Sequence, residues 1–529
     1  MKLSVNDLQN PAWRNSGYSM PRFDIAEVRA ETAERPVWLH FGAGSIFRAF
    51  PAALMQKLLN DGLAKAGISV CEAYDGDIIK TSYAPYDDLS VAVTLKSDGT
   101  VDKAVIASVA EAFALLEDEK RLEEIFRAPS LQTVSFTITE KGYSIGPELE
   151  RDAAKGPSAG LREYESLMGL VAAMLYKRYK NGAFSLAMVS LDNCARNGDK
   201  LLAAVAYAAE KWAAGGAADA GFPRYIRDPG RVSFPLTMID KITPRPSESV
   251  AELLRKDGLA GMDIAVTAKD TYTAAFVNAE EAQYLVVEDA FPNGRPPLER
   301  AGAIFTDRET VEKTDRMKVC TCLNPLHTIL GTFGCLLRHR TIAAAMRDAA
   351  LVALVRRAGY DEGLPVVTDP KIIKPAEFIG EVLEKRLPNP FIPDTPERIV
   401  CDNSHKIPVR FGETLKAYAA GGMDMSGLTA IPFFIAGWVR YLMGVDDDGK
   451  EIIISPDPRA AELREHIKAI RLGATGDCRE ALRPIFSDAS LFGLDLYECG
   501  LAAKAEAYFG EMVSGAGAVR AALERRWGI

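Results

Sequence analysis

A lysine, an asparagine and a histidine lie within one short apolar segment, Met317 to His327, and their types suit proton transfer. Asn324 and His327 are three residues apart, so they share one face if the segment is helical. A lysine such as Lys318, placed in a water-excluded cleft, has its ammonium form disfavoured and can act as a base near neutral pH. Each residue alone is more often structural, and the prediction of an acid/base site rests on their combination.

The same segment holds Cys320 and Cys322 in a C-x-C arrangement. No second cysteine pair or nearby histidine pair completes a zinc site, so we expect no metal. The eight cysteines are sparse and mostly isolated, which favours reduced thiols. The N-terminal residues contain no apolar run typical of a secretory signal. We therefore expect a cytoplasmic protein.

A second candidate site is the turn Gly42-Ala43-Gly44, which follows an expected strand, Val37 to Phe41, and precedes a helix. Glycines at such a turn let the backbone approach a pyrophosphate at the helix N-terminus. The third glycine of the G-x-G-x-x-G pattern is replaced by Phe47. The next expected strand ends in acidic residues, and Glu72 or Asp77 would accept hydrogen bonds from ribose hydroxyls and favour NAD over NADP.

These residues need a sheet and helices to position them. Alternating segments predict an α/β fold, with strands at 37–41, 68–71, 89–95, 133–139 and 184–190 and helical stretches such as 50–59, 110–127 and 164–179. After the Pro292–Pro297 turn the periodic segments are mostly helical. We predict a Rossmann-type NAD-binding domain with a large mixed sheet over 1–297, and a mainly α-helical, substrate-binding and catalytic domain over 298–529.

The composition is that of an ordinary globular protein and excludes a disordered or fibrous chain. Apolar residues make up 48% and charged residues 26% of the 529 residues, and the net charge is −9. This charge does not suit a nucleic-acid partner. The most membrane-like run, Gly427 to Val439, is too short to span a bilayer and predicts a buried helix or a turn of the core. We expect a small-molecule substrate as the partner, no membrane, and a monomer or small homo-oligomer.

Several separated motifs resemble the long-chain mannitol dehydrogenase family, which includes polyol dehydrogenases and hexuronate reductases. They span roughly residues 38 to 410 in the family's order and comprise His40 to Gly44 through Arg48, Thr137 to Tyr143, Ser190 to Asn193 with Asn197-Gly198, Met238 to Pro244, Glu288 to Phe291 before Gly294-Arg295-Pro296, the Lys318/Asn324/His327 segment, and Asn389-Pro390 through Asp394-Thr395, Arg398, Ser404 and Lys406.

The resemblance implies a metal-independent, NAD(P)-dependent oxidoreductase. In this sequence the family's catalytic lysine matches Lys318, its two alkoxide-stabilising asparagines match Asn193 and Asn324, and its histidine matches His327. The implied substrate contacts are Asp240, Arg398 and Lys406, and the implied cofactor contacts are Gly42, Gly44, Phe47, Arg48, Glu72 and Asp77.

One spacing differs from the polyol members of the family. Their lysine and first asparagine are five steps apart, whereas Lys318 and Asn324 are six steps apart. A bulge, or a strand-to-helix change between the two residues, would restore the geometry. The NPLHT form of the segment also differs from the NGxH form of the polyol members.

The basic residues Arg398, Lys406 and Arg410 suit the C1 carboxylate of a sugar acid, since arginine can bind a carboxylate through two hydrogen bonds. We therefore expect interconversion of D-mannonate and D-fructuronate with NAD. The alternatives are a polyol 2-dehydrogenase that converts mannitol or arabinitol to a ketose, a tagaturonate reductase, and a catalytically silent binding protein on the same fold.

Overall fold

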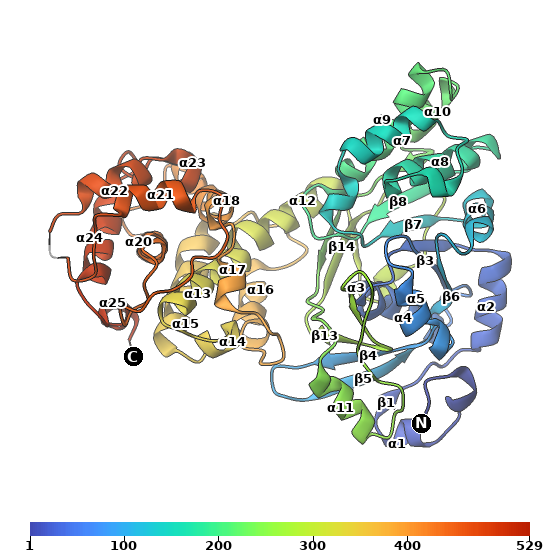
Figure 1. Ribbon diagram of the computed structural model, residues 1–529, viewed down its shortest axis with the longest axis horizontal. Coiled ribbons are helices and arrows are strands. Elements are labelled where there is room, and N and C mark those ends of the chain that lie inside the picture. Colours follow the sequence, from blue (N-terminus) through green and yellow to red (C-terminus); the bar gives the residue numbers. More distant parts are fainter. Residues whose placement is uncertain (475, 529) are drawn as a thin grey trace. The chain divides into compact units, whose positions relative to one another are not determined.

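The computed structural model describes residues 1–474 and 476–528, and the chain divides into two compact units (Figure 1). Unit 1 comprises residues 1–96 and 100–312, and unit 2 comprises residues 97–99 and 313–529. The sequence predicts a boundary near 297. Unit 1 continues further because the chain adds one more strand after the proline-rich turn, β15 (Ile304–Thr306), which pairs in parallel with β14 (Tyr284–Glu288).

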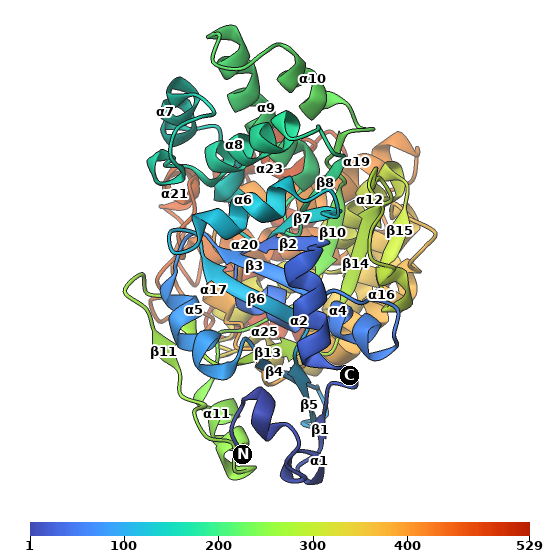
Figure 2. The same cartoon turned by 90° about the vertical axis from the view of Figure 1, so that its right-hand side faces the viewer.

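The centre of unit 1 is a six-stranded, all-parallel sheet in the order β6-β3-β2-β7-β8-β9 (Figure 2). Numbered along the chain, this is the 3-2-1-4-5-6 order of a Rossmann fold, and it confirms the predicted Rossmann-type class. The predicted large mixed sheet is wrong in one respect, because this central sheet is all parallel and the antiparallel pairs lie in separate, smaller sheets. The strand order reverses between β2 and β7, where such folds bind ligands at the carboxyl ends of the strands. The strands are β2 (Trp38–Phe41), β3 (Ile68–Glu72), β6 (Val109–Ala114), β7 (Thr133–Phe136), β8 (Leu186–Ser190) and β9 (Val232–Ser233).

Helices cover both faces of this sheet, because successive strand side chains point to opposite faces. Trp38 packs on one face with residues of α2 (Ile25–Glu34), α3 (Ser45–Ala49) and α4 (Pro51–Asn60). Leu39 and Phe41 pack on the other face with α6 (Glu119–Arg127), α8 (Leu167–Lys180) and α9 (Asn197–Ala214). Both core clusters are apolar.

The prediction of a helix over 110–127 is wrong in its first part. Residues 109–114 form β6, the third strand of the Rossmann order, and the helix α6 begins only at Glu119. A short apolar run can form a buried strand or a helix, and periodicity alone does not separate the two. Here the pairing of β6 with β3 determines that the run forms a strand.

Three smaller sheets complete unit 1 and contain its antiparallel pairs. They are β1-β5-β4-β13, β10-β14-β15 and β11-β12, formed by β1 (Tyr18–Ser19), β4 (Ser90–Leu95), β5 (Val101–Ile106), β10 (Thr237–Asp240), β11 (Ala265–Val266), β12 (Tyr272–Thr273) and β13 (Phe276–Glu280). The remaining α-helices of this unit are α1 (Ala12–Asn15), α5 (Asp77–Ser82), α7 (Pro147–Lys155), α10 (Gly221–Arg227) and α11 (Glu248–Lys256).

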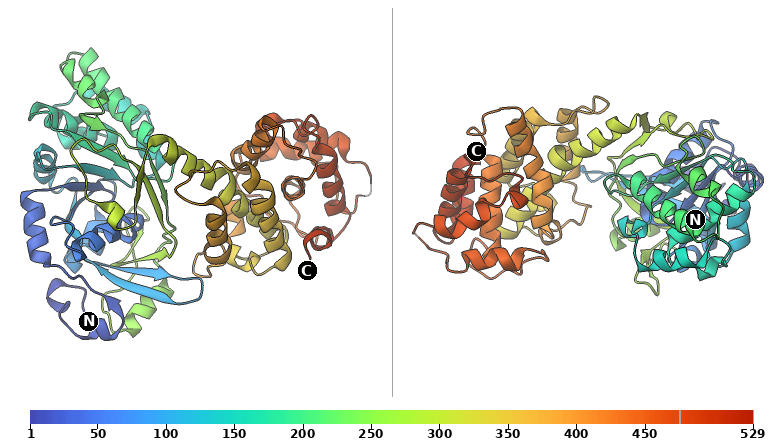
Figure 3. Two further views of the ribbon diagram at one scale, coloured as in Figure 1. Left: turned by 180° about the vertical axis from the view of Figure 1, so that it is seen from behind. Right: turned by 90° about the horizontal axis from the view of Figure 1, so that it is seen from above.

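Unit 2 is helical (Figure 3), as the sequence predicts. Its helices are α13 (Asn324–Leu336), α14 (Ile342–Ala345), α15 (Ala349–Arg356), α16 (Pro375–Glu381), α17 (Pro396–Ile399), α18 (Asn403–Ile407), α19 (Glu413–Ala420), α20 (Ala430–Leu442), α21 (Ala460–Ile467), α22 (Arg479–Phe486), α23 (Ala489–Phe492), α24 (Ala502–Val513) and α25 (Ala518–Trp527). Four π-helical turns interrupt them, η6 (Lys318–Cys322), η7 (Arg357–Gly363), η9 (Val382–Arg386) and η10 (Pro408–Gly412).

Two apolar helices bear on the question of a membrane span. Every residue of α20 is buried, which confirms the prediction of a buried helix there. The continuous helical run from Arg308 to Leu336, made of α12 (Arg308–Met317), η6 and α13, is long and apolar enough to cross a membrane. However, 83% of its most apolar window is buried inside the protein, as in the core helix of a folded domain.

Candidate active site

The glycine turn lies at the carboxyl end of β2, beside β7, where the strand order reverses. Gly42 has φ +108°, and a Cβ there would stand 2.5 Å from the carbonyl oxygen of Thr137, so only glycine fits. Gly44 precedes α3 and has an ordinary φ of −76°, with open space where a Cβ would stand. The turn therefore offers bare backbone at the position where a Rossmann fold receives a pyrophosphate.

Glu72, at the end of β3, binds the glycine turn itself. Its Oε2 accepts a hydrogen bond from Ala43 N at 2.7 Å, and its Oε1 accepts from Tyr74 N at 2.8 Å and Asp75 N at 3.0 Å. The side chain is buried. Glu72 thus ties two loops together through backbone N–H groups, and its role as a ribose ligand stays a prediction.

The other acidic residues of this stretch have different surroundings. Asp75 is buried, and its Oδ2 accepts a hydrogen bond from Thr267 Oγ1 at 2.6 Å. Asp77 begins α5, leaves 47% of its side chain exposed, and has the Lys80 ammonium 3.9 Å away. Asp77 is therefore the carboxylate of this stretch that is more accessible to a ribose.

Phe47 and Arg48 point into the protein. Phe47 is fully buried and stacks on the ring of His40 with centroids 4.1 Å apart. Arg48 is buried, donates a hydrogen bond to the carbonyl of Ala274 at 2.7 Å, and lies over the ring of Tyr83. These side chains support the helix behind the glycine turn, and their predicted contact with the cofactor stays untested.

A buried polar network behind the turn was not foreseen from the sequence. His40 Nδ1 lies 2.6 Å from Ser135 Oγ, which also accepts a hydrogen bond from Trp38 Nε1 at 2.7 Å. His40 Nε2 lies 3.0 Å from Thr137 Oγ1, beside Gly42. Burial lowers the pKa of His40 to about 3, so the ring is neutral at neutral pH. The network joins β2 to β7. In the sequence, only the histidine just before the glycine turn indicated it.

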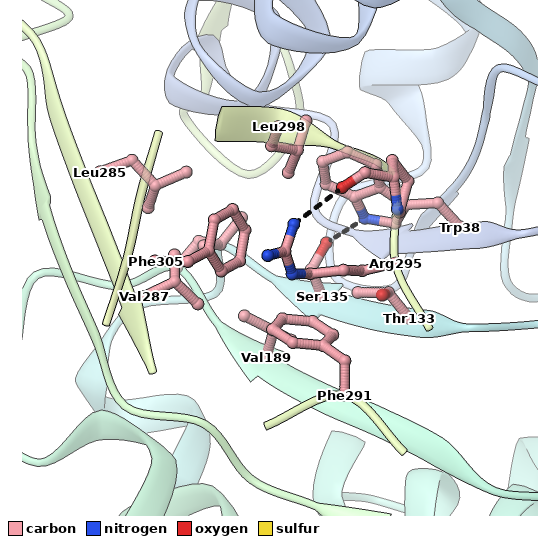
Figure 4. A pocket seen from close by; sticks show the side chains of 12 residues that line it. Trp38, Thr133, Ser135, Val189, Leu285, Val287, Phe291, Arg295, Leu298 and Phe305 are labelled. Carbon is pink, nitrogen blue, oxygen red and sulfur yellow. Dashed lines mark hydrogen bonds between the residues drawn. The ribbon is translucent and has the colours of Figure 1, made fainter. Parts of the chain in front are cut away.

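Figure 4 shows a cavity beside this network, lined in part by Trp38 and Ser135. Most of its lining is apolar side chains of β2, β8 and the β10-β14-β15 sheet, and β7 contributes the polar Thr133 and Ser135. The Arg295 guanidinium lies 3.3 Å from the centre of the Phe305 ring and pairs with Asp289 and Glu299. Its cation is therefore already satisfied, and we assign this cavity to the core behind the sheet.

Asn193 lies on the exposed loop that follows β8, again at the carboxyl end of the sheet. Its neighbour Asp192 holds that loop against the segment after β7. Asp192 Oδ2 accepts hydrogen bonds from Ile138 N at 3.0 Å and from the Tyr143 hydroxyl at 2.5 Å, and its Oδ1 accepts from Thr139 N at 2.8 Å. Hydrogen bonds to Asp192 thus join the two sequence motifs 137–143 and 190–193 in the structure.

Asn197 joins the same loop to β10. Its side-chain amide donates to the carbonyl of Asp192 at 3.0 Å and to the hydroxyl of Thr237 at 2.8 Å, and its oxygen accepts from Thr237 N at 3.1 Å. Asp240 ends β10 and is buried. The structure therefore connects the Asn193 loop with the strand that bears Asp240.

In unit 2, Lys318 is buried at the start of the π turn η6. Its Nζ lies 3.7 Å from a carboxylate oxygen of Asp315, one turn earlier. The carbonyl of Lys318 accepts a hydrogen bond from Leu323 N at 3.1 Å, a bond that spans five residues instead of the α-helical four. The π turn is the bulge that the six-step spacing required, and Asn324 begins α13 directly after it.

His327 lies on the first turn of α13, three residues after Asn324. Its Nε2 is 3.5 Å from a carboxylate oxygen of Asp394, and 17% of its side chain is exposed. Burial lowers the pKa of His327 to about 3, and the cations Arg410, Arg398, Arg386 and Lys406 lower it further. The imidazole is therefore neutral at neutral pH and a poor base.

These cations surround His327 with an excess of positive charge. Arg398 forms an ion pair with Asp394, and Lys406 Nζ donates hydrogen bonds to the carbonyls of Cys401 at 2.5 Å and Ile399 at 3.4 Å. Burial and the charge of Arg410 lower the pKa of Lys406. The structure thus groups the predicted residues His327, Arg398 and Lys406 in unit 2.

The cysteines beside Lys318 are apolar in character. Burial raises the pKa of Cys320 to about 11 and raises that of Cys322 well above its usual range, so both carry a proton at neutral pH. Within residues 1–474 and 476–528, no three His, Cys, Asp or Glu side chains are grouped as metal ligands.

Comparison with known proteins gives matches over most of the chain. Residues 37–300 match the mannitol dehydrogenase Rossmann domain, and residues 310–499 match the mannitol dehydrogenase C-terminal domain. The D-mannonate oxidoreductase of Thermotoga maritima is 49% identical over 97% of this chain and 96% of its own length. The mannitol 2-dehydrogenase of Cereibacter sphaeroides is 28% identical over 82% of this chain and 86% of its own length.

A solved structure supports the fold. The Pseudomonas fluorescens mannitol 2-dehydrogenase, in a ternary complex with NAD and D-mannitol, aligns with a TM-score of 0.70. The alignment covers 99% of both chains at 24% identity, a level that bears on the fold alone.

Proposed function

This chain belongs to the mannitol dehydrogenase family of oxidoreductases, and from that premise we propose that it interconverts D-mannonate and D-fructuronate with NAD. The observation that supports this substrate is the 49% identity to a D-mannonate oxidoreductase over 97% of the chain. The proposal includes a small-molecule partner, a cytoplasmic location and a reaction without a metal ion.

The residues at the carboxyl end of the Rossmann sheet fit a dinucleotide. Gly42 has no room for a Cβ, whereas Gly44 leaves open space at the start of α3. Asp77 is the exposed carboxylate for the adenosine ribose, and Glu72 holds the glycine turn in place. When bound there, NAD supplies the hydride acceptor for oxidation and, in its reduced form, the hydride donor for reduction.

Lys318 is the acid/base group in this proposal. In oxidation its neutral amine takes the proton of the reacting hydroxyl, and in reduction its ammonium returns that proton to the carbonyl oxygen. The amide groups of Asn193 and Asn324 donate hydrogen bonds to the same oxygen as negative charge develops. Asp240, Arg398 and Lys406 contact the rest of the substrate.

His327 orients the substrate or Lys318 and does not carry the proton. A histidine with a pKa of about 3 holds a proton weakly at neutral pH, so it is a poor base there. This property of His327 supports the assignment of proton transfer to Lys318.

A panel of substrates tests the proposal. Formation of NADH is measured with D-mannonate, D-altronate, D-mannitol and D-arabinitol, and its consumption with D-fructuronate and D-tagaturonate. We expect the highest kcat/KM with the mannonate and fructuronate pair. A preference for mannitol or arabinitol would establish the polyol alternative, and NADH binding without turnover would establish a silent binding protein.

Metal independence has its own test. Activity should survive exhaustive EDTA treatment, because Lys318 takes the place of a Lewis acid. Loss of activity that zinc restores would overturn the metal-free mechanism and direct attention to Cys320 and Cys322.

A further inference from the structure

Arg410 differs from Arg398, because no carboxylate among the described residues pairs with it. Its Nη1 donates a hydrogen bond to Thr328 Oγ1 at 2.5 Å. Within the described part of the chain, residues 1–474 and 476–528, it forms no ion pair with a carboxylate. Burial lowers the pKa of Arg410 to about 10, so the guanidinium still carries its charge at neutral pH. The side chain is partly buried, and a cation that is shielded from water and has no counterion is costly unless a ligand provides one.

The two predicted substrate cations are already engaged within the protein. Arg398 is paired with Asp394 and leaves 64% of its side chain exposed. Lys406 donates hydrogen bonds to the carbonyls of Cys401 and Ile399. The charge of Arg398 is therefore paired, and the Lys406 ammonium already donates to two carbonyl oxygens, whereas Arg410 donates to a single hydroxyl.

The position of Arg410 relative to the expected reaction centre is set by α13. Thr328, which accepts from Arg410, donates a hydrogen bond to the carbonyl of Asn324 at 2.8 Å. The four steps from Asn324 to Thr328 span about one helical turn, about 6 Å along the axis. D-Fructuronate is D-mannonate with its C5 hydroxyl oxidised, so the reacting carbon and the C1 carboxylate lie at opposite ends of a short chain. One helical turn suits that separation.

Arg410 also lies on a rigid support. It belongs to the π turn η10, where a Cβ on Gly412 would stand 2.8 Å from the carbonyl oxygen of Phe492. Thr414, at the start of the following helix, donates a hydrogen bond to the carbonyl of Cys320 in η6 at 3.2 Å. The turn that bears Arg410 is thus connected to the turn that begins with Lys318.

We propose that Arg410 binds the carboxylate of the substrate and is the residue that selects sugar acids over polyols. This inference rests on the proposed function and adds the group that recognises the acid. The guanidinium offers two parallel N–H donors to a carboxylate. A polyol would leave this charge without a partner, which penalises its binding.

The test compares an acid substrate with its neutral amide. The kcat/KM values for D-mannonate, D-mannonamide and D-mannitol are measured for the wild type, Arg410→Gln and Arg410→Lys. Arg347→Gln, which removes an exposed arginine of unit 2, is the matched control. Glutamine can still donate to Thr328, so the fold should persist, and thermal unfolding of each variant checks this.

We expect Arg410→Gln to lower kcat/KM for D-mannonate on the order of 100-fold, as for loss of one charge-assisted pair. Its values for the amide and for mannitol should change less than about threefold on the same reasoning. The kcat/KM of Arg410→Lys for D-mannonate should lie between those of the wild type and Arg410→Gln, because lysine keeps the charge and loses the paired donors. An equal loss on all three substrates would overturn the assignment of Arg410 while leaving the proposed function intact.

Measurements with other aldonates test the Arg410 proposal separately from the proposed substrate. If the wild type prefers D-altronate and Arg410→Gln loses that activity selectively, the carboxylate role stands and the proposed substrate is wrong. If the wild type turns over polyols only, both proposals fail.

Discussion

Lys318 and His327, two residues of one segment, are the candidates for the group that transfers the proton. Lys318→Ala should lower kcat by roughly 100- to 10,000-fold, the range for general acid/base catalysis, while NADH binding persists. A small added amine should restore part of the activity. Lys385→Ala, at an exposed lysine of unit 2, is the control and should behave as the wild type. The roles are reversed if Lys318→Ala loses less than about tenfold and His327→Ala loses far more.

Removal of the negative charge at Glu72 and at Asp77 should have different effects on cofactor use. Asp77→Asn should raise kcat/KM with NADPH relative to NADH, because it removes an exposed carboxylate that repels a 2′-phosphate. Glu72→Gln should weaken both cofactors alike, because its amide would face backbone donors in place of a carboxylate that accepts three N–H bonds. Equal or better kcat/KM with NADPH in the wild type would contradict the NAD assignment, and a relaxed preference in Glu72→Gln alone would move the ribose to Glu72.

At the scale of an element, the two glycines of the turn separate folding from cofactor binding. Gly42→Ala places a Cβ 2.5 Å from a backbone oxygen at φ +108°, so it should destabilise the protein by about 1–3 kcal/mol. Gly44→Ala has open space and an ordinary φ, so its melting temperature should match the wild type. Its NADH affinity should fall, because the methyl group occupies the space of the pyrophosphate.

The measurements for this pair are thermal unfolding without ligand and NADH fluorescence titration. A Gly44→Ala variant that binds NADH within about twofold of the wild type would show that the dinucleotide does not pass over this turn. A Gly42→Ala variant as stable as the wild type would contradict the close approach of β7.

At the scale of the whole molecule, acid should weaken the fold through its buried histidines. The pKa of His40 is about 3 in the folded protein, against 6.5 for an ordinary histidine, so between these pH values the unfolded chain binds more protons. Lowering the pH through this window therefore favours unfolding, by about 1.4 kcal/mol per pH unit for each such histidine. Burial raises the pKa of Asp88 to about 6, which acts in the opposite direction.

A comparison of variants isolates this effect. His40→Asn should be less stable than the wild type at pH 7, because it removes a packed ring, but its melting temperature should fall less between pH 7 and pH 5. His405→Asn, at an exposed histidine, is the control and should follow the wild type. Parallel loss of stability in His40→Asn and the wild type would contradict a neutral, buried His40.

Local patterns were enough to determine many of the elements and part of the site. The glycine turn after a buried strand, the strand and helix alternation, and the helical second half all depend on residues close in the chain. The same holds for the Lys318 segment, where the six-step spacing called for the bulge that η6 supplies.

Only the tertiary structure decided which partner each polar side chain takes, because those partners are far apart in sequence. Glu72 binds Ala43 N 29 residues away, and His40 contacts Ser135 across 95 residues. The apolar run that forms β6 became a strand through its pairing with β3. Arg398 and Arg410 look alike in the sequence, but the fold neutralises Arg398 with Asp394 and leaves Arg410 with its charge uncompensated.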